Sequence, residues 1–166
     1  MEHDPNTANY FFHALHQAHR AAVQAGLTER GLEALGSPLL MMLLQCGKEN
    51  GEIPTQRELA RVMLVSPAAI AMSLKSLERL GFVEKRTDPA DQRRKRVTVT
   101  PSGEAAVEAC WKVLLEVDRK MMEGFSPKER RELERCHQRM LQNLMGAEGS
   151  APENPFERMG CQCSKP

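Results

Sequence analysis

The sequence predicts a mostly helical α+β fold, with a helix-turn-helix and a β-hairpin in the middle and long helices at both ends. Three observations predict it. Apolar residues recur at helical spacing through most of the chain, two helical segments are separated by a tight turn, and two strand-like segments flank a charged bend. With 166 residues, 41% of them hydrophobic and 27% charged, we expect one domain of ordinary composition. That domain is expected over residues 8–145, followed by a mobile tail at 146–166.

Composition excludes several classes of protein. The longest apolar run, residues 39–44, is far shorter than the ~20 residues of a membrane span. The N-terminus carries acids and no cluster of cations, which is unlike a signal peptide. The five cysteines are an odd number and are widely spaced, apart from Cys161 and Cys163, so reduced thiols are expected. A cytoplasmic protein is therefore predicted.

Long helices are predicted at both ends of the domain. Residues 9–25 carry apolar side chains at helical spacing, and Gly26 is the expected stop. A Thr-Pro pair starts the second region, 101–145, and a capping box at 126–129 opens the last helix there. The apolar face expected on that last helix consists of Leu133, His137, Met140, Leu141 and Leu144.

The helix-turn-helix and the hairpin are predicted in the middle of the chain, at about residues 37–100. Its first helix follows Ser37 and is apolar nearly all round, so it is expected to be central. Thr55 and Glu58 form a capping box for a short helix, and Ser66 caps a longer one that Gly81 ends. The buried stripe of that longer helix is expected to be Ile70, Leu74 and Leu77.

The hairpin places four consecutive cations at its bend, residues 93–96. Residues 57–96 hold ten Lys and Arg against five Asp and Glu, although the net charge of the chain is only +1. Two interpretations are open: a solvated turn that protects an edge strand from pairing, or contacts with DNA phosphates and a narrow minor groove. The helix-turn-helix immediately upstream favours DNA.

The second helix of the helix-turn-helix is expected to enter the DNA major groove. Its outward face is small and poorly charged, so it suits apolar contact with thymine methyls and offers few bidentate hydrogen bonds. The affinity is then expected to come from the hairpin. The predicted DNA-binding residues are Thr55, Gln56, Ser66, Pro67, Ala68, Ala69, Met72, Ser73, Lys75, Ser76, Arg86, Arg93, Arg94 and Lys95.

The hairpin and the helix start after it resemble the signature of the MarR (multiple antibiotic resistance regulator) family, Asp-x-Arg-x-x-x-Val-x-Leu-Thr-x-x-Gly. The matching residues are Asp91, Arg93, Val97, Val99, Thr100 and Gly103, with Val99 in place of Leu. The preceding SLKSLERLGFVEKR is similar to the recognition helix and first wing strand of that family, and the order of elements matches from about residue 8 to 145. One departure is Met72, where many members have Arg or Lys.

The resemblance implies a winged helix-turn-helix protein that acts as a homodimer on a palindromic operator in double-stranded DNA. The helices at 9–25 and 101–145 would form the dimerisation region, and the half-sites would lie about one helical turn, ~34 Å, apart. Family members usually repress, and a small ligand or the oxidation of a cysteine releases them. The resemblance also implies that Arg93 reaches into the minor groove, and the same role extends to Arg94.

Three kinds of switch are compatible with the sequence. An apolar ligand pocket is one, although each of its residues is individually more typical of a core. The histidines His13, His16 and His19 fan over a third of a helix circumference, which is more typical of solvated residues than of a metal site. Cys46, Cys161 and Cys163 are the candidate redox thiols. The candidate pocket residues are Phe11, Phe12, Leu15, Met41, Met42 and Trp111.

The predicted function is a homodimeric DNA-binding transcription regulator, most simply a repressor released by a small ligand. An enzyme is not expected, because no acid–base pair or activated nucleophile can be placed, and no cofactor or metal is predicted. The alternative is a metal- or redox-sensing regulatory protein that acts mainly through protein partners and binds DNA weakly.

Overall fold

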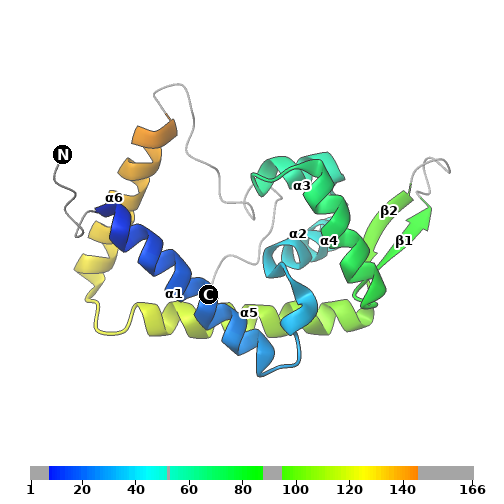
Figure 1. The fold of residues 1–166 in the computed structure, drawn as a ribbon, viewed down its shortest axis with the longest axis horizontal. Coiled ribbons are helices and arrows are strands. Elements are labelled where there is room, and N and C mark those ends of the chain that lie inside the picture. Colours follow the sequence, from blue (N-terminus) through cyan, green and yellow to red (C-terminus); the bar gives the residue numbers. More distant parts are fainter. Residues whose placement is uncertain (1–7, 52, 88–94, 146–166) are drawn as a thin grey trace. The chain divides into compact units, whose positions relative to one another are not determined.

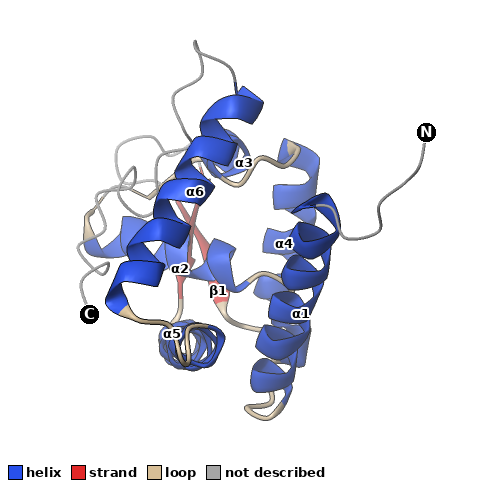
Figure 2. Cartoon of the chain, turned by 90° about the vertical axis from the view of Figure 1, so that its left-hand side faces the viewer, coloured by secondary structure: helices blue, strands red, loops and turns tan. Residues whose placement is uncertain are grey.

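The computed structural model describes residues 8–51, 53–87 and 95–145 (Figure 1). The elements in chain order are α1 (Ala8–Thr28), the 3₁₀ turn η1 (Glu33–Leu35), α2 (Pro38–Glu49), α3 (Gln56–Val62), α4 (Pro67–Arg79), β1 (Val83–Thr87), β2 (Lys95–Val99), α5 (Pro101–Met121) and α6 (Pro127–Met145). The strands form one antiparallel pair among the helices (Figure 2). This arrangement confirms the predicted fold class.

The chain divides into two compact units. One contains residues 1–34 and 108–123, and the other contains residues 35–107 and 124–166. No single helix among the described residues is long and apolar enough to cross a membrane, and α3 and α4 reach that length and composition only as a pair bent by 111°.

In the first unit, α1 packs closely on α5 at a glycine. The prediction that Gly26 stops this helix is wrong, because α1 continues to Thr28 and the left-handed residue after it is Gly31, with φ +68°. A Cβ on Gly26 would lie 2.8 Å from Cγ1 of Val113. Glycine is therefore needed at this position for the close approach of the two helices, and its conformational freedom is not used there.

An arginine clamps the same contact. Arg30 donates from Nη1 to the carbonyl oxygen of Gly26 at 2.9 Å, and from Nη2 to both carboxylate oxygens of Glu116 at 2.8 and 2.9 Å. A guanidinium that binds a carboxylate and a backbone carbonyl together fixes the angle at which helices approach better than a single pair does. The C-terminal turn of α1 is thus tied to the middle of α5.

The core of the second unit is built around α2, as predicted. Ser37 caps this helix by accepting from the backbone N of Leu40 at 3.4 Å. Most apolar residues of α2 are buried, and the stripe predicted for the longer helix, now α4, packs in the same core. The side chains that are at most 4% exposed here include Leu40, Met41, Met42, Leu43, Leu44, Cys46, Ile70, Leu74 and Leu77.

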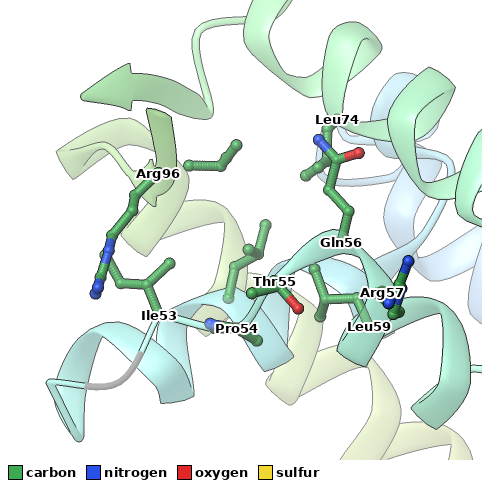
Figure 3. A pocket seen from close by; sticks show the side chains of 10 residues that line it. Ile53, Pro54, Thr55, Gln56, Arg57, Leu59, Leu74 and Arg96 are labelled. Carbon is green, nitrogen blue, oxygen red and sulfur yellow. The ribbon is translucent and has the colours of Figure 1, made fainter. Parts of the chain in front are cut away.

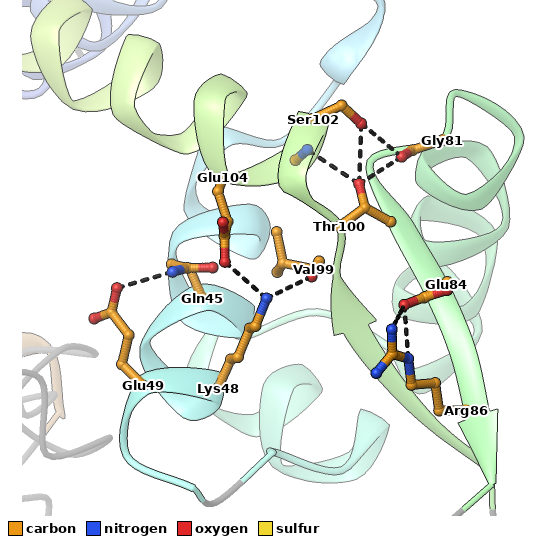
Figure 4. Close-up of polar contacts among 11 residues, drawn as sticks. Gln45, Lys48, Glu49, Gly81, Glu84, Arg86, Val99, Thr100, Ser102 and Glu104 are labelled. Carbon is orange, nitrogen blue, oxygen red and sulfur yellow. Dashed lines mark hydrogen bonds and ion pairs between the residues drawn. The ribbon is translucent and has the colours of Figure 1, made fainter.

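The hairpin joins the core through its base. Val83 pairs with Val99 in the antiparallel register, and both are buried. The Thr100 hydroxyl donates to the carbonyl oxygen of Gly81 at 2.7 Å and accepts from the backbone N of Gly103 at 3.1 Å, so it caps α5 and binds the end of α4 together (Figure 4). The start of α5 is therefore locked to the loop that precedes β1.

A lysine links α2 to the same region. Lys48 donates from Nζ to the carbonyl oxygen of Val99 at 2.9 Å and to Oε1 of Glu104 at 2.7 Å (Figure 4). The pair is part-exposed, so its charge interaction is worth less than about 1 kcal/mol, but the backbone contact also orients the last residue of β2. Lys48 therefore joins three elements, α2, β2 and α5.

The turn between α3 and α4 contains Leu64, the one residue other than glycine with a positive φ, +55°, among the described residues. Its side chain is 80% exposed, so it gains little from burial. We expect Leu64→Asn to raise the free energy of unfolding by about 1 kcal/mol, because asparagine tolerates the left-handed region better. Urea unfolding measures this, with Val65→Asn next to it as the control. An unchanged or lowered stability in Leu64→Asn would show that the turn is not strained.

Candidate nucleic-acid interface

The two helices α3 and α4 form a helix-turn-helix whose starts are fixed by side-chain caps. The chain bends by 111° between them, within the range of this motif. At the start of α3, Oγ1 of Thr55 accepts from the backbone N of Glu58 at 3.2 Å, and Oε2 of Glu58 accepts from the backbone N of Thr55 at 2.7 Å. Hydrogen bonds from the backbone and the hydroxyl of Thr55 lower the pKa of Glu58. Ser66 caps α4 by accepting from the backbone N of Ala69 at 3.1 Å.

The outward face of α4 has two different halves. With Ile70, Leu74 and Leu77 buried, the opposite stripe at spacings of four, three and four residues is Ala68, Met72, Lys75 and Arg79, all exposed. The N-terminal half of this stripe carries only apolar side chains, and Met72 is 75% exposed. The C-terminal half carries two cations. Serine hydroxyls on the flank, Ser73 and Ser76, are half-buried.

Strand β1 carries cations that are already paired. Lys85 binds Glu78 of α4, and Arg86 donates from Nε to Oε1 of Glu84 at 2.7 Å (Figure 4). Both pairs are exposed enough to exchange their partners with little loss of free energy. A phosphate can therefore displace Glu84 from Arg86, but the two cations of β1 are balanced by the carboxylates of Glu84 and of Glu78 on α4.

A cavity of about 500 Å³ lies beside the start of α3 (Figure 3). Most of its lining residues are apolar, and polar groups come from Gln56 and Arg57 of α3, from the cap Thr55 and from Arg96 of β2. This combination suits a small amphipathic anion. The residues that line it are Leu44, Ile53, Pro54, Thr55, Gln56, Arg57, Leu59, Leu74, Arg96 and Val97.

Comparison with known proteins decides the family. The MarR family profile matches residues 40–94, which include the helix-turn-helix. The HTH-type transcriptional regulator BilQ of Clostridium symbiosum (strain WAL-14163) is 30% identical over 101 residues, which are 61% of this chain and 69% of BilQ. The chain belongs to the MarR family. It is a transcription regulator with a DNA-binding winged helix, and regulators of this family are generally not enzymes.

Solved structures share the MarR fold over most of the chain. The S. aureus MepR–DNA complex aligns with a TM-score of 0.70 and 22% identity, and covers 86% of this chain and 99% of MepR. CouR from Rhodococcus jostii RHA1, bound to p-coumaroyl-CoA, aligns with a TM-score of 0.63 and 21% identity, and covers 81% of this chain and 92% of CouR.

The structure brings most of the predicted DNA-binding residues of this MarR protein to the surface of α3, α4 and β1. Arg93 and Arg94 lie outside the described residues, and Lys95 begins β2. Three exposed arginines of the helix-turn-helix were not predicted: Arg57, Arg61 and Arg79. Arg79 could have been found from the sequence, since it lies eleven residues, about three helical turns, after Ala68 on the same face. The predicted residues found exposed are Thr55, Gln56, Ser66, Pro67, Ala68, Ala69, Met72, Lys75 and Arg86.

The six residues predicted for a ligand pocket have different surroundings. Met41 and Met42 are 0% and 2% exposed and fill the core of the second unit. Phe11, Phe12 and Leu15 are exposed in the first unit, and Trp111 of that unit is half-buried. None of the six lines the cavity beside α3. The ligand pocket of this MarR protein stays a prediction.

The candidate metal and redox groups are placed as follows. Within residues 8–51, 53–87 and 95–145, no three His, Cys, Asp or Glu side chains are arranged to hold a metal ion. Cys46 is buried and disulfide-bonded, so the expectation of reduced thiols is wrong for this residue. Cys161 and Cys163 lie outside the described residues. Burial raises the pKa of the Cys110 thiol to about 11, so the thiolate that a redox sensor requires is scarce at neutral pH.

Proposed function

We propose that this MarR-family protein is a homodimeric repressor that binds a palindromic operator and is released by a small ligand. The observation that carries the proposal is the exposed outward face of α4, on a helix held at its start by the Ser66 cap and on its inner side by three buried residues. A rigid helix with a solvent-facing stripe is what major-groove docking requires.

The contacts with DNA divide by chemistry. The first two turns of α4 meet base edges, and Lys75 and Arg79 of its second half meet phosphates. Thr55 and Gln56, exposed at the start of α3, contact the backbone of the duplex. We propose that Arg93, Arg94 and Lys95 supply further phosphate contacts and that Arg93 enters the minor groove.

Homodimer formation is supported by apolar faces that a single chain leaves uncovered. On α1, Phe11, Phe12 and Leu15 are 58%, 61% and 48% exposed. On α6, Met140 and Leu144, which belong to the predicted apolar face, are 44% and 85% exposed. Clusters of exposed aromatic and aliphatic side chains on helices mark protein interfaces, and a second copy of the chain supplies the same faces in return.

Release by a ligand requires that the ligand bind the DNA-bound and DNA-free conformations with different affinity. CouR bound to p-coumaroyl-CoA is an example of a protein of this fold with a small ligand. For this chain, we propose Phe11, Phe12, Leu15 and Trp111 of the first unit as the ligand-responsive residues.

The proposal is tested by fluorescence anisotropy with duplex DNA from upstream of the protein's own gene, across a salt series and with unrelated competitor DNA. Tight binding that resists the competitor and weakens steeply with salt is expected, because each phosphate contact releases counterions. Binding no stronger than to the competitor, with a shallow salt slope, would instead favour the alternative of a sensor that acts through protein partners.

The contribution of the hairpin is tested with Arg93→Ala. We expect weaker binding to every duplex tested, and a log–log salt slope that is flatter by about one for each phosphate that the variant no longer neutralises. Arg119→Ala is the matched control and should leave the slope unchanged. Arg119 is exposed on α5, outside the winged lobe, which consists of the helix-turn-helix and the hairpin. Equal affinity and slope for Arg93→Ala and the parent would remove the hairpin from the DNA contacts.

A further inference from the structure

We propose that α4 recognises its half-site through thymine methyl groups, and that Met72 is the main specificity-determining residue. The inference rests on the proposed DNA-binding function and adds to it the class of base that is read. It follows from the chemistry of the side chains that α4 presents, taken together with the groups that each base pair shows in the major groove.

The reading end of α4 has no side chain that can form a bidentate hydrogen bond with a base. Helices of this motif contact base edges with their N-terminal residues. Over residues 67–73 the exposed side chains of α4 are proline, alanine and methionine. The usual partners of guanine and adenine are arginine, lysine, asparagine and glutamine, and none of them occurs on α4 before Lys75.

The two hydroxyl groups near this end are only partly available to a base. Oγ of Ser66 accepts the backbone N–H of Ala69 as the helix cap. Ser73 is half-buried on the flank of the stripe, 100° from Met72. Hydrogen-bond readout from the first two turns is therefore weak, and apolar contact is the chemistry that remains.

In the major groove, the thymine C5-methyl is the distinctive apolar group that a base pair offers. Ala68 and Ala69 are small enough to let the helix approach the base edges closely. Met72, one turn further, has a long, flexible and polarisable side chain that is 75% exposed and can fill the space between neighbouring methyl groups. Lys75 and Arg79 follow on the same stripe, where the helix moves away from the bases toward the phosphates. The change from apolar to basic along one face orients the helix with Met72 over the bases.

The test uses duplexes that differ only in these methyl groups. A preferred duplex is first selected from a random-sequence library with the full-length protein, and is then synthesised with deoxyuridine in place of thymidine. We expect thymines in both half-sites, and a loss of affinity of about fourfold for each contacted methyl group when uracil replaces thymine. Met72→Ala should bind the uracil duplex nearly as well as the parent protein does and should lose most of the preference for thymine.

Arg79→Ala is the matched control on the same face of α4. It should weaken binding to the thymine and uracil duplexes by the same factor, since its expected partner is a phosphate. Equal affinity of the parent protein for the thymine and uracil forms of the selected duplex would overturn the inference and leave sequence-specific binding intact. Failure to select any duplex over random DNA would overturn both the inference and the proposed function.

Discussion

Replacement of Gly103 by alanine is expected to lower the free energy of unfolding by about 3 kcal/mol or more, at or above the upper end of the usual cost of overpacking. A Cβ at this position would lie 2.1 Å from the carbonyl oxygen of Phe82 and 2.7 Å from Cγ1 of Val99. The carbonyl cannot move aside freely, because it accepts from the backbone N of Thr100 at 3.0 Å, while the N–H of Phe82 donates to Leu77 at 3.0 Å. The added methyl group would therefore clash with a backbone carbonyl that hydrogen bonds hold in place.

Urea unfolding followed by circular dichroism measures the effect, and Gly26→Ala is the graded control. Its Cβ would meet a side chain, Val113 at 2.8 Å, which yields more easily than a backbone carbonyl. Alanine also gains about 1 kcal/mol of helix propensity over glycine, which offsets part of that clash. A Gly103→Ala protein as stable as the parent, or more stable than Gly26→Ala, would show that the loop at Phe82 is not held as the structure places it.

Leu144→Asp is expected to convert the proposed dimer into a monomer and to weaken operator binding by a hundredfold or so. The Leu144 side chain is 85% exposed, so the substitution leaves the fold of the single chain nearly untouched. In an interface, however, a buried unpaired carboxylate costs several kcal/mol. A monomer binds one half-site, and the loss of linkage between two half-sites removes the gain in effective concentration.

Light scattering at micromolar concentration measures the mass, which should fall from twice the chain mass to the 18.6 kDa of one chain. Gln142→Asp places the same charge on the opposite side of α6, about 160° away, and should remain dimeric. A parent protein that is already monomeric, or a Leu144→Asp protein that stays dimeric, would contradict the assignment of this face to the dimer.

The elements of the winged lobe could be predicted from sequence because their determinants are local. Capping boxes at Thr55 and Ser126, the cap at Ser66 and the left-handed Gly81 are all found where the sequence placed them. The stripe of buried residues on α4 follows from helical periodicity alone. These features depend on groups within about four residues of one another. Their spacing in the sequence therefore predicts which of them are close in space.

The candidate interface could be predicted in part for the same reason. Periodicity gave the outward face of α4, with its poor charge, but the partners of the hairpin cations depend on residues that the spacing does not relate. Lys85 is paired with Glu78 of α4, and Arg86 with Glu84 of its own strand. Contacts of this kind determine whether a cation must give up an acidic partner before it binds a phosphate.

The glycines show most clearly which features local sequence determines and which depend on tertiary contacts. From sequence, Gly26 and Gly81 are equivalent candidates for helix ends, yet only Gly81 has a positive φ, whereas Gly26 lies inside α1 against Val113. Gly103 stands in the family motif, but the reason for it is the carbonyl oxygen of Phe82, which lies 21 residues back in the chain and would be 2.1 Å from a Cβ. The sequence by itself determined the helices, the hairpin and the apolar outward face of α4. Only the tertiary structure shows which positions require glycine for close packing. The reason is that steric exclusion acts between atoms that only the folded chain brings together.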